Sequence, residues 1–219
     1  MNIEALSAKA LRAFCDLLTR RGGGMADAGA DDSDGKVESE IFRLFMHESE
    51  RAIVVLGVAK LDADLEEILK RVFRPVGGKR DPLFDPGEAL SSFGTKIQLA
   101  ERLGVIEKDF ATVLQTLRKI RNDFAHNATD PKLSLANHRE RVEQIAKWAA
   151  EDRSYGLVMY VYAEPASFPD LRLKFIASMT TIMLLFSAAK RTAKRIDAGL
   201  PIARTGPPFD VAKFLESKT

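Results

Sequence analysis

The stretch KDFATVLQTLRKIRNDFAH, residues 108–126, carries the pattern that decides the fold of this chain. Its apolar residues recur at intervals of three or four positions, which is the spacing of one face of an α-helix. We therefore expect a helix from about Lys108 to Ala125. The side chains expected to point into the core are Val113, Leu117, Ile120 and Phe124.

Most of the remaining chain shows the same helical period. Further helices are expected at residues 39–73, 91–104, 137–150 and 170–196. Gly57 and Asp62 are candidate break points in the first of these. Ser91 or Ser92 can cap the second, and Asn137 with Glu140 predicts a capping box for the third. Residues 157–162 are the only strand-like run, which we interpret as an extended segment or an extra helical turn. The chain is thus predicted to be all-α, a single bundle of about five or six helices.

Glycine, proline and acidic residues divide the chain into segments. Residues 1–21 predict an N-terminal amphipathic helix, and residues 22–37, which begin with three glycines, predict a flexible linker. The helical domain is expected to span residues 38–198, and residues 199–219 are expected to form a C-terminal tail. A chain of 219 residues is long enough for one well-buried domain and short for two.

The composition favours a protein of the reducing cytoplasm. Cys15 is the only cysteine, so the chain can form no internal disulfide and no thiol-rich metal site. No HExxH or comparable spacing indicates a metal, and we expect no cofactor. The apolar run at residues 175–189 is shorter than the roughly 20 residues that cross a bilayer, so we expect a buried core helix and no membrane span. The net charge of +2 restricts any nucleic-acid binding to a local patch.

The end of the quoted helix holds the candidate site. Residues 118–126 contain three cations, an amide and one of the three histidines of the chain. Arg121 can hold a phosphate oxygen through paired hydrogen bonds, and histidine, here His126, is the residue type most often used for proton transfer at neutral pH. These two residues lie about 140° apart around an ideal helix, so they converge on a ligand only if the helix bends or ends near Phe124. The cluster is therefore either a phosphodiester-handling site or a polar helix terminus, where the helix dipole favours cations.

The chemistry that this cluster could support is metal-independent cleavage of RNA, in which a 2′-hydroxyl attacks the adjacent phosphorus. His126 would be the acid or base, Arg121 the electrostatic clamp and Asn122 a positioning hydrogen-bonder. Arg118 and Lys119 would contact the nucleic acid. Because a single histidine cannot comfortably perform both proton transfers at once, this hypothesis predicts a homodimer with the site at its two-fold interface.

Three other polar clusters have plainer interpretations. His47 is expected on a solvated helical turn in which Glu48 pairs with Arg51. His138 is expected on a solvated helix face beside two arginines. Lys190 is expected at the cationic C-terminal end of a helix.

Four stretches together resemble the MltR-type mannitol operon repressor family. They are ESERA at 48–52, LSSFGTKI at 90–97, LGVI at 103–106 and RKIRNDFAH at 118–126. The resemblance covers roughly residues 40–130, and that family in turn resembles the HEPN group of all-helical domains. Many HEPN domains act as metal-independent RNases, and their Arg-x4–6-His motif maps here onto Arg121, Asn122 and His126. Other HEPN-like domains are non-catalytic binding modules.

Two hypotheses follow for the function. The first is a cytoplasmic regulatory protein of the MltR type, a transcriptional regulator that acts through protein or nucleic-acid contacts without turnover. The alternative is a dimeric HEPN-like endoribonuclease that uses Arg121 and His126. The chain has no recognisable DNA-reading element, which argues against direct sequence-specific DNA binding, whereas the intact motif argues for the nuclease. We favour the regulator, and the sequence leaves open whether the protein is an enzyme.

Overall fold

The computed structural model describes residues 45, 47–78, 80–127, 131–163 and 169–196. Within these ranges the chain forms six α-helices and one 3-10 turn, η1 (Pro82–Phe84), and no strand. The helices are α3 (Glu50–Val72), α4 (Phe93–Arg102), α5 (Lys108–His126), α6 (Ala136–Ala149), α7 (Arg153–Ala163) and α8 (Asp170–Thr192). The predicted all-α bundle of five or six helices is confirmed. The predicted N-terminal helix at 1–21, linker at 22–37 and tail at 199–219 lie outside the described residues.

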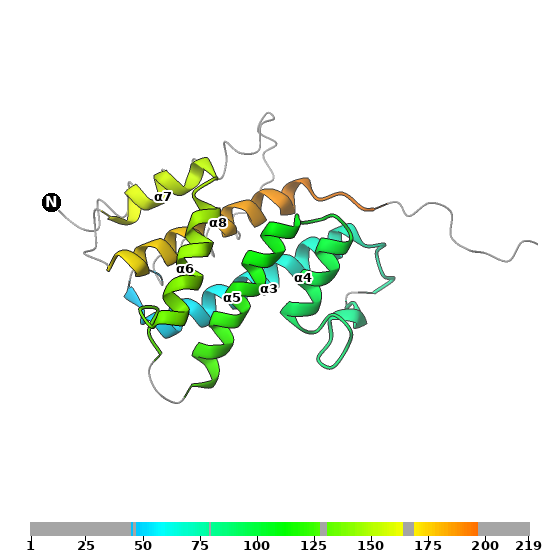
Figure 1. The fold of residues 1–219 in the computed structure, drawn as a ribbon. Coiled ribbons are helices and arrows are strands. Elements are labelled where there is room, and N and C mark those ends of the chain that lie inside the picture. Colours follow the sequence, from blue (N-terminus) through cyan, green and yellow to red (C-terminus); the bar gives the residue numbers. More distant parts are fainter. Residues whose placement is uncertain (1–44, 46, 79, 128–130, 164–168, 197–219) are drawn as a thin grey trace, which may run out of the picture.

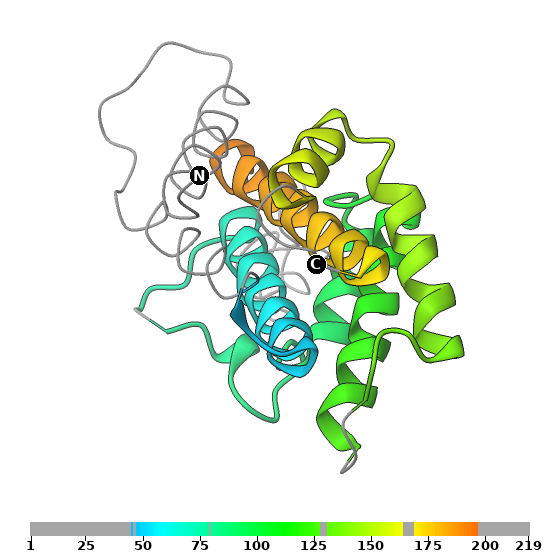
Figure 2. The ribbon, with the colours of Figure 1, turned by 90° about the vertical axis from the view of Figure 1, so that its left-hand side faces the viewer.

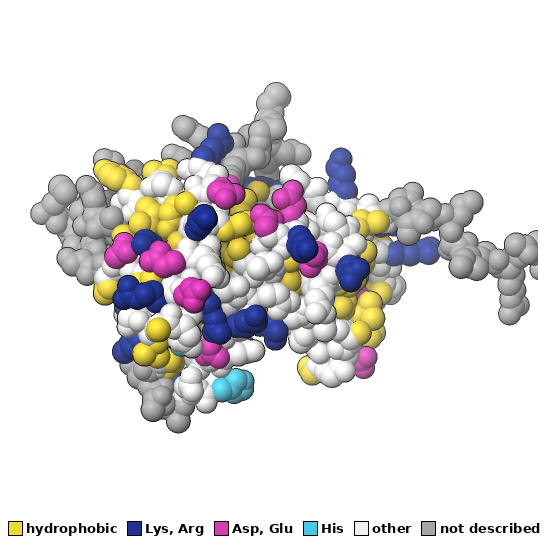
Figure 3. All heavy atoms as spheres, viewed as in Figure 1, with side chains coloured by type: hydrophobic (Ala, Val, Ile, Leu, Met, Phe, Trp, Pro, Cys, Tyr) yellow, Lys and Arg dark blue, Asp and Glu magenta, His cyan; other side chains and the backbone are white. Residues whose placement is uncertain are grey.

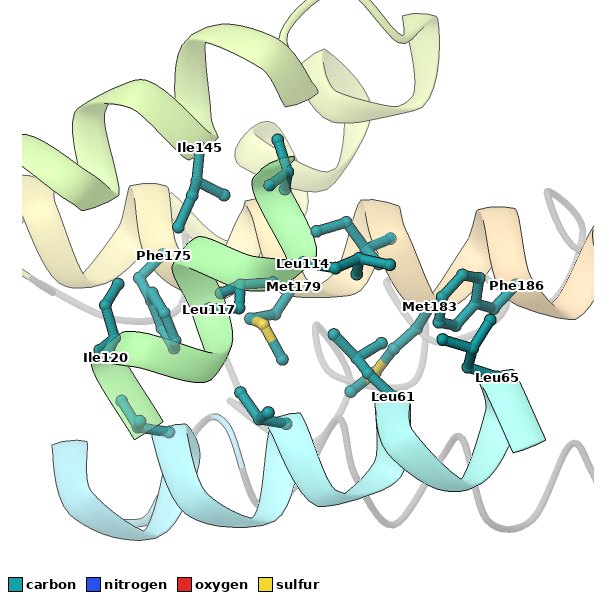
Figure 4. Packing of buried hydrophobic residues seen from close by; sticks show 14 of the residues in the cluster. Leu61, Leu65, Leu114, Leu117, Ile120, Ile145, Phe175, Met179, Met183 and Phe186 are labelled. Atoms are coloured by element: carbon teal, nitrogen blue, oxygen red, sulfur yellow. The ribbon is translucent and has the colours of Figure 1, made fainter. Parts of the chain in front are cut away.

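The bundle is built around its two longest helices, α3 and α8, which pack against each other (Figures 1 and 2). Helices α4 and α5 pack on α3, while α6 and α7 pack on α8, with α7 on the side away from α3 (Figure 2). Figure 4 shows Leu61 and Leu65 of α3 facing Met183 and Phe186 of α8. The α5 stripe enters the same core, and its predicted members are all buried. This shared apolar core fixes α5, and therefore its polar side, relative to α3 and α4.

Helix α3 begins at Ser49, whose hydroxyl accepts a hydrogen bond from the Ala52 N–H at 3.2 Å. The helix then runs unbroken through Gly57 and Asp62, so neither candidate break point interrupts it. Gly57 has a packing reason, because a Cβ atom there would lie 2.8 Å from Met179 Cε of α8. The missing side chain lets the two central helices approach each other closely.

The chain around α6 and α7 corrects two predictions. Helix α6 begins at Ala136 after Leu135, and Asn137 lies inside its first turn, where its side chain bonds the His138 N–H at 2.9 Å. The predicted capping box is therefore wrong, because the N-cap residue is Leu135, two positions before Asn137. Residues 157–162 are fully helical as part of α7, so the extended interpretation is wrong as well. Ser154 and Val158, four positions apart, are buried against the bundle, which is a helical spacing.

Helix α8 is the one helix of the described chain that is long and apolar enough to cross a membrane. The structure buries 72% of its most apolar 18-residue window inside the bundle. Helices α3, α6 and α7 all pack on it. Its apolar character is accounted for by this central position, as predicted for a core helix.

Candidate functional site

A pocket of about 280 Å³ lies where the polar side of α5 meets α3 and the start of α4. Three separate parts of the chain contribute to its wall. Its lining residues are Val58, Ala59, Asp62, Ser91, Ser92, Phe93, Gly94, Arg118, Arg121 and Asn122. Three of the predicted site residues, Arg118, Arg121 and Asn122, line this pocket from α5, and the fold places α3 and the start of α4 opposite them.

Arg118 is held flat against the beginning of α4. A Cβ atom on Gly94 would lie 3.3 Å from Arg118 Cζ, so the guanidinium covers the face that the missing side chain leaves open. Arg118 Nε donates to Gln115 Oε1 at 2.9 Å, and Gln115 Nε2 donates to the Gly94 carbonyl at 3.4 Å. These contacts use the Nε donor, and within the described residues no hydrogen bond uses the two terminal nitrogens of Arg118.

Arg121 and Asn122 form the next part of the wall. Arg121 Nη1 donates to Asn122 Oδ1 at 3.2 Å, which orients the amide beside the guanidinium. In the part of the chain that the structure describes, no carboxylate forms an ion pair with Arg118 or Arg121. Two half-buried guanidinium groups without a carboxylate partner make this wall strongly positive, and their fork of donors matches the geometry of a phosphate.

The beginning of α4 adds a second source of positive potential. Ser92 is the N-cap residue, and its hydroxyl accepts a hydrogen bond from the Thr95 N–H at 3.2 Å. This confirms the predicted cap. The N-terminus of a helix carries a partial positive charge and unsatisfied N–H groups. Phe93 and Gly94 of the first turn line the pocket, so this end of the helix reinforces the field of the two arginines.

Asp62 gives the pocket one acidic residue, and a buried lysine compensates it. Lys96 Nζ of α4 lies 2.7 Å from Asp62 Oδ1 and 2.7 Å from Glu66 Oε2. Burial alone lowers the pKa of Lys96, but the hydrogen bonds and charges of Asp62 and Glu66 outweigh it, and the net effect is a raised pKa. Lys96 therefore stays cationic and ties α4 to α3 directly behind the pocket.

His126 lies outside this pocket. Helix α5 runs from Lys108 to His126 with Asn127 as its C-cap, one residue beyond the expected end at Ala125. His126 is thus still helical, and the ending near Phe124 that would let Arg121 and His126 converge does not occur. Residues 121 and 126 remain about 140° apart around the helix, and His126 is exposed. Lys119 is exposed as well and does not line the pocket. Figure 3 shows Lys and Arg side chains gathered over the C-terminal half of α5, with a histidine protruding at the lower edge.

The position of the α5 end is fixed by contacts from α3. Arg51 donates to the Asn127 carbonyl, so the predicted pairing of Arg51 with Glu48 does not describe this residue. Glu50 Oε2 accepts a hydrogen bond from the Leu133 N–H at 2.8 Å, which ties the beginning of α6 to the same place. The α3 N-terminus thus anchors both sides of the connection that follows His126.

The prediction that His138 lies on a solvated helix face is wrong, whereas Lys190 lies in the last turn of α8, as predicted, and is also buried. His138 is 2% exposed. Its Nδ1 lies 2.9 Å from the Lys132 carbonyl and its Nε2 lies 3.3 Å from Asp123 Oδ2. Lys190 is 5% exposed and lies 3.1 Å from Asp64 Oδ1 of α3. Both residues can be buried because each has hydrogen-bonding partners outside its own helix, which helical spacing does not reveal.

Sequence reasoning missed the Asp62 and serine contributions to the pocket. The sequence pattern predicts Asp62 only as a possible helix break, and Ser91 or Ser92 only as a helix cap. The one sequence signal for this opposite wall is the polar side of residues 108–126, because a polar helix side that lines a pocket must face residues of another element. The described residues contain no group of three or more His, Cys, Asp or Glu side chains that could hold a metal ion.

Comparison with known proteins adds no relative to this picture. No family model matches the chain, and neither a curated protein nor a solved structure matches it. The resemblance to the MltR-type family and to HEPN domains therefore rests on the residues quoted above, and the all-helical fold is what the structure adds to it.

Proposed function

We propose that the protein is a cytoplasmic regulatory protein of the kind that the MltR resemblance implies, and that it acts by binding a phosphate group of a nucleic acid between α4 and α5. One observation carries this proposal. Arg118 and Arg121 line a pocket of about 280 Å³ without a carboxylate partner in the described chain. A guanidinium pair beside a helix N-terminus is chemically suited to a phosphate anion.

The size of the pocket limits what it can recognise. At about 280 Å³ it lies at the small end of ligand pockets, which usually measure roughly 300–1,000 Å³. It can hold one phosphate with the adjoining sugar atoms, but it offers no exposed aromatic side chain on which a base could stack. Contacts of this kind position a nucleic acid and carry no sequence information. Lys119, exposed on the same helix, would extend the contact along the backbone.

The position of His126 favours a single chain that binds nucleic acid over a single chain that cleaves it. General acid–base catalysis needs a proton donor or acceptor within hydrogen-bond reach of the reacting atoms. His126 does not line the pocket that holds Arg121 and Asn122. Regulation through a protein partner bound together with the nucleic acid is compatible with the same arrangement.

Fluorescence anisotropy of labelled oligonucleotides tests this proposal. We expect Arg121→Ala and Arg118→Ala each to weaken binding by on the order of tenfold, since each removes a charged hydrogen-bond donor. The matched control is Arg139→Ala, because Arg139 is exposed on α6 and away from the pocket. Equal binding by all four proteins would show that the pocket is not the binding site.

A dimeric HEPN-like endoribonuclease is the second candidate, and the exposure of His126 favours it. His138 is sequestered by Asp123 and Lys132, whereas His126 stands free on the surface one helical turn beyond Asn122. In a symmetric homodimer, the His126 of a second chain could complete the site. Purified protein should then cleave RNA in excess EDTA and leave cyclic-phosphate ends, and His126→Ala should abolish cleavage without unfolding the chain. RNA that stays intact over a range of substrates would refute this candidate.

A further inference from the structure

The pocket contains a hydrogen-bond acceptor as well as donors, and this inference rests on the proposed function. Asp62 lies on the α3 wall, with a side chain that is 31% exposed. Its Oδ1 atom is buried beside Lys96 Nζ, which leaves Oδ2 as the carboxylate oxygen available to a ligand. Among the residues that the structure describes, no donor is bonded to Asp62 Oδ2.

Lys96 makes this carboxylate a fixed part of the site. The Lys96 side chain is 4% exposed and approaches Asp62 from α4, between the two helices. Its second partner, Glu66, is bonded in turn to Lys70 at 2.6 Å. The row Lys70, Glu66, Lys96 and Asp62 therefore alternates in charge, which holds the Asp62 carboxylate in one place at little electrostatic cost.

An acidic wall is unfavourable for a bare phosphate, because the two negative charges repel each other across a small pocket. It becomes favourable when the ligand carries a hydroxyl donor next to its phosphate. In a ribonucleotide the 2′-hydroxyl lies beside the 3′-phosphate, whereas a deoxyribonucleotide has no donor there. Arg118 and Arg121 supply donors for the phosphate oxygens, and Asp62 supplies the acceptor that the hydroxyl needs.

We infer that Asp62 is a specificity-determining residue that accepts a hydrogen bond from the sugar hydroxyl, so that the pocket takes ribonucleotides in preference to deoxyribonucleotides. The shared chemistry is a phosphate with an adjacent hydroxyl, whether it lies in an RNA strand or in a free nucleotide. A competing ribonucleoside 3′-monophosphate should displace labelled RNA better than its deoxy counterpart does. Equal displacement by the two nucleotides would contradict the inference.

The direct test compares three labelled single-stranded oligonucleotides of one sequence: RNA, DNA and 2′-fluoro RNA. The fluorine keeps the sugar conformation of RNA but removes the donor. We expect the native protein to bind RNA on the order of tenfold more tightly than either of the others, as for one hydrogen bond to a charged group. Because this comparison uses the native protein, it does not depend on the folding of a variant.

The variant Asp62→Asn adds a second readout. It should bring the affinities for RNA and DNA within about twofold of each other and should bind DNA no more weakly than the native protein, because a repulsive charge is gone. If Asp62 had only a structural role, its replacement would lower the affinities for RNA and DNA together. Glu67→Gln is the matched control, since Glu67 lies on the same helix, is 43% exposed and does not line the pocket, so its replacement should preserve the preference for RNA.

The outcomes separate this inference from the proposed function. If RNA and DNA bind equally well and Arg121→Ala weakens both, the role of Asp62 is wrong and the phosphate-binding pocket stands. If Asp62→Asn keeps the full preference for RNA, the inference is wrong as well. If the native protein binds neither oligonucleotide, both proposals fail together.

Discussion

Replacement of Asp64 by asparagine should destabilise the bundle, because it removes the counter-charge of a buried lysine. Asp64 and Lys190 join the two central helices, and each side chain is 5% exposed. Loss of one partner of a buried ion pair typically costs about 3–5 kcal/mol. We expect about 3 kcal/mol here, at the low end of that range, since Glu67 Oε2 lies 3.5 Å from Lys190 Nζ and compensates part of the charge.

Urea unfolding followed by circular dichroism measures this loss. A thermal melt gives a second measure of the same loss. At roughly 2–4 °C per kcal/mol for a domain of this size, the melting temperature of Asp64→Asn should fall by about 6–12 °C. The control is Glu67→Gln, because Glu67 is 43% exposed and its ion pairs should contribute less than about 1 kcal/mol. The double change Asp64→Leu with Lys190→Met should recover much of the loss. If Asp64→Asn costs no more than Glu67→Gln, the buried pair does not stabilise the fold as argued.

Three further predictions concern the site and its supports. Gly94→Ala should weaken oligonucleotide binding, measured by fluorescence anisotropy, because the new Cβ would lie 3.3 Å from Arg118 Cζ and displace the guanidinium. Its melting temperature should be unchanged or higher, because alanine favours a helix more than glycine does. Lower stability with unchanged affinity would contradict this prediction. His138→Ala should lower the free energy of unfolding, measured in urea, by about 2–3 kcal/mol. The reason is that it removes a buried ring that contacts Asp123 and Phe124. The control His126→Ala, which changes an exposed side chain, should alter stability little. For Glu66, burial alone raises the pKa, but hydrogen bonds from Lys70 and Lys96 outweigh it and lower the pKa below its usual 4.5. Its contribution is thus present above pH 4.5 and lost as the pH falls through the lowered value, so the acid limb of the stability curve should be shallower in Glu66→Gln than in the native protein.

The helical period predicted the fold because it is a local property of the chain. The apolar residues spaced along α5, such as Leu117 and Ile120, are buried as expected, and Ser92 caps α4. The same period could not place polar residues whose environment depends on distant partners. Lys190 and Asp64 are 126 positions apart, and His138 meets Asp123 of the preceding helix. A polar residue on a helix is expected in solvent until the fold supplies such a partner.

The candidate site was predictable only in the part that lies on one helix. The row of Arg118, Arg121 and Asn122 follows from the sequence, because residues three and four apart share a helix face. The opposite wall, with Asp62 and Ser92, comes from α3 and the start of α4 and depends on how these helices pack. The exclusion of His126 depended on the point at which α5 ends, and helix ends are the least predictable feature of a helix.

The central claim is that the Arg118 and Arg121 guanidinium groups contact a phosphate of the bound nucleic acid. The most direct measurement is an NMR titration of the arginine Nε–Hε resonances with a short RNA oligonucleotide. We predict that the resonances of Arg118 and Arg121 shift together and saturate, while that of Arg139 on α6 stays in place. Shifts at Arg139 that equal those at the pocket, or no shift at Arg121 when RNA is bound, would contradict the account.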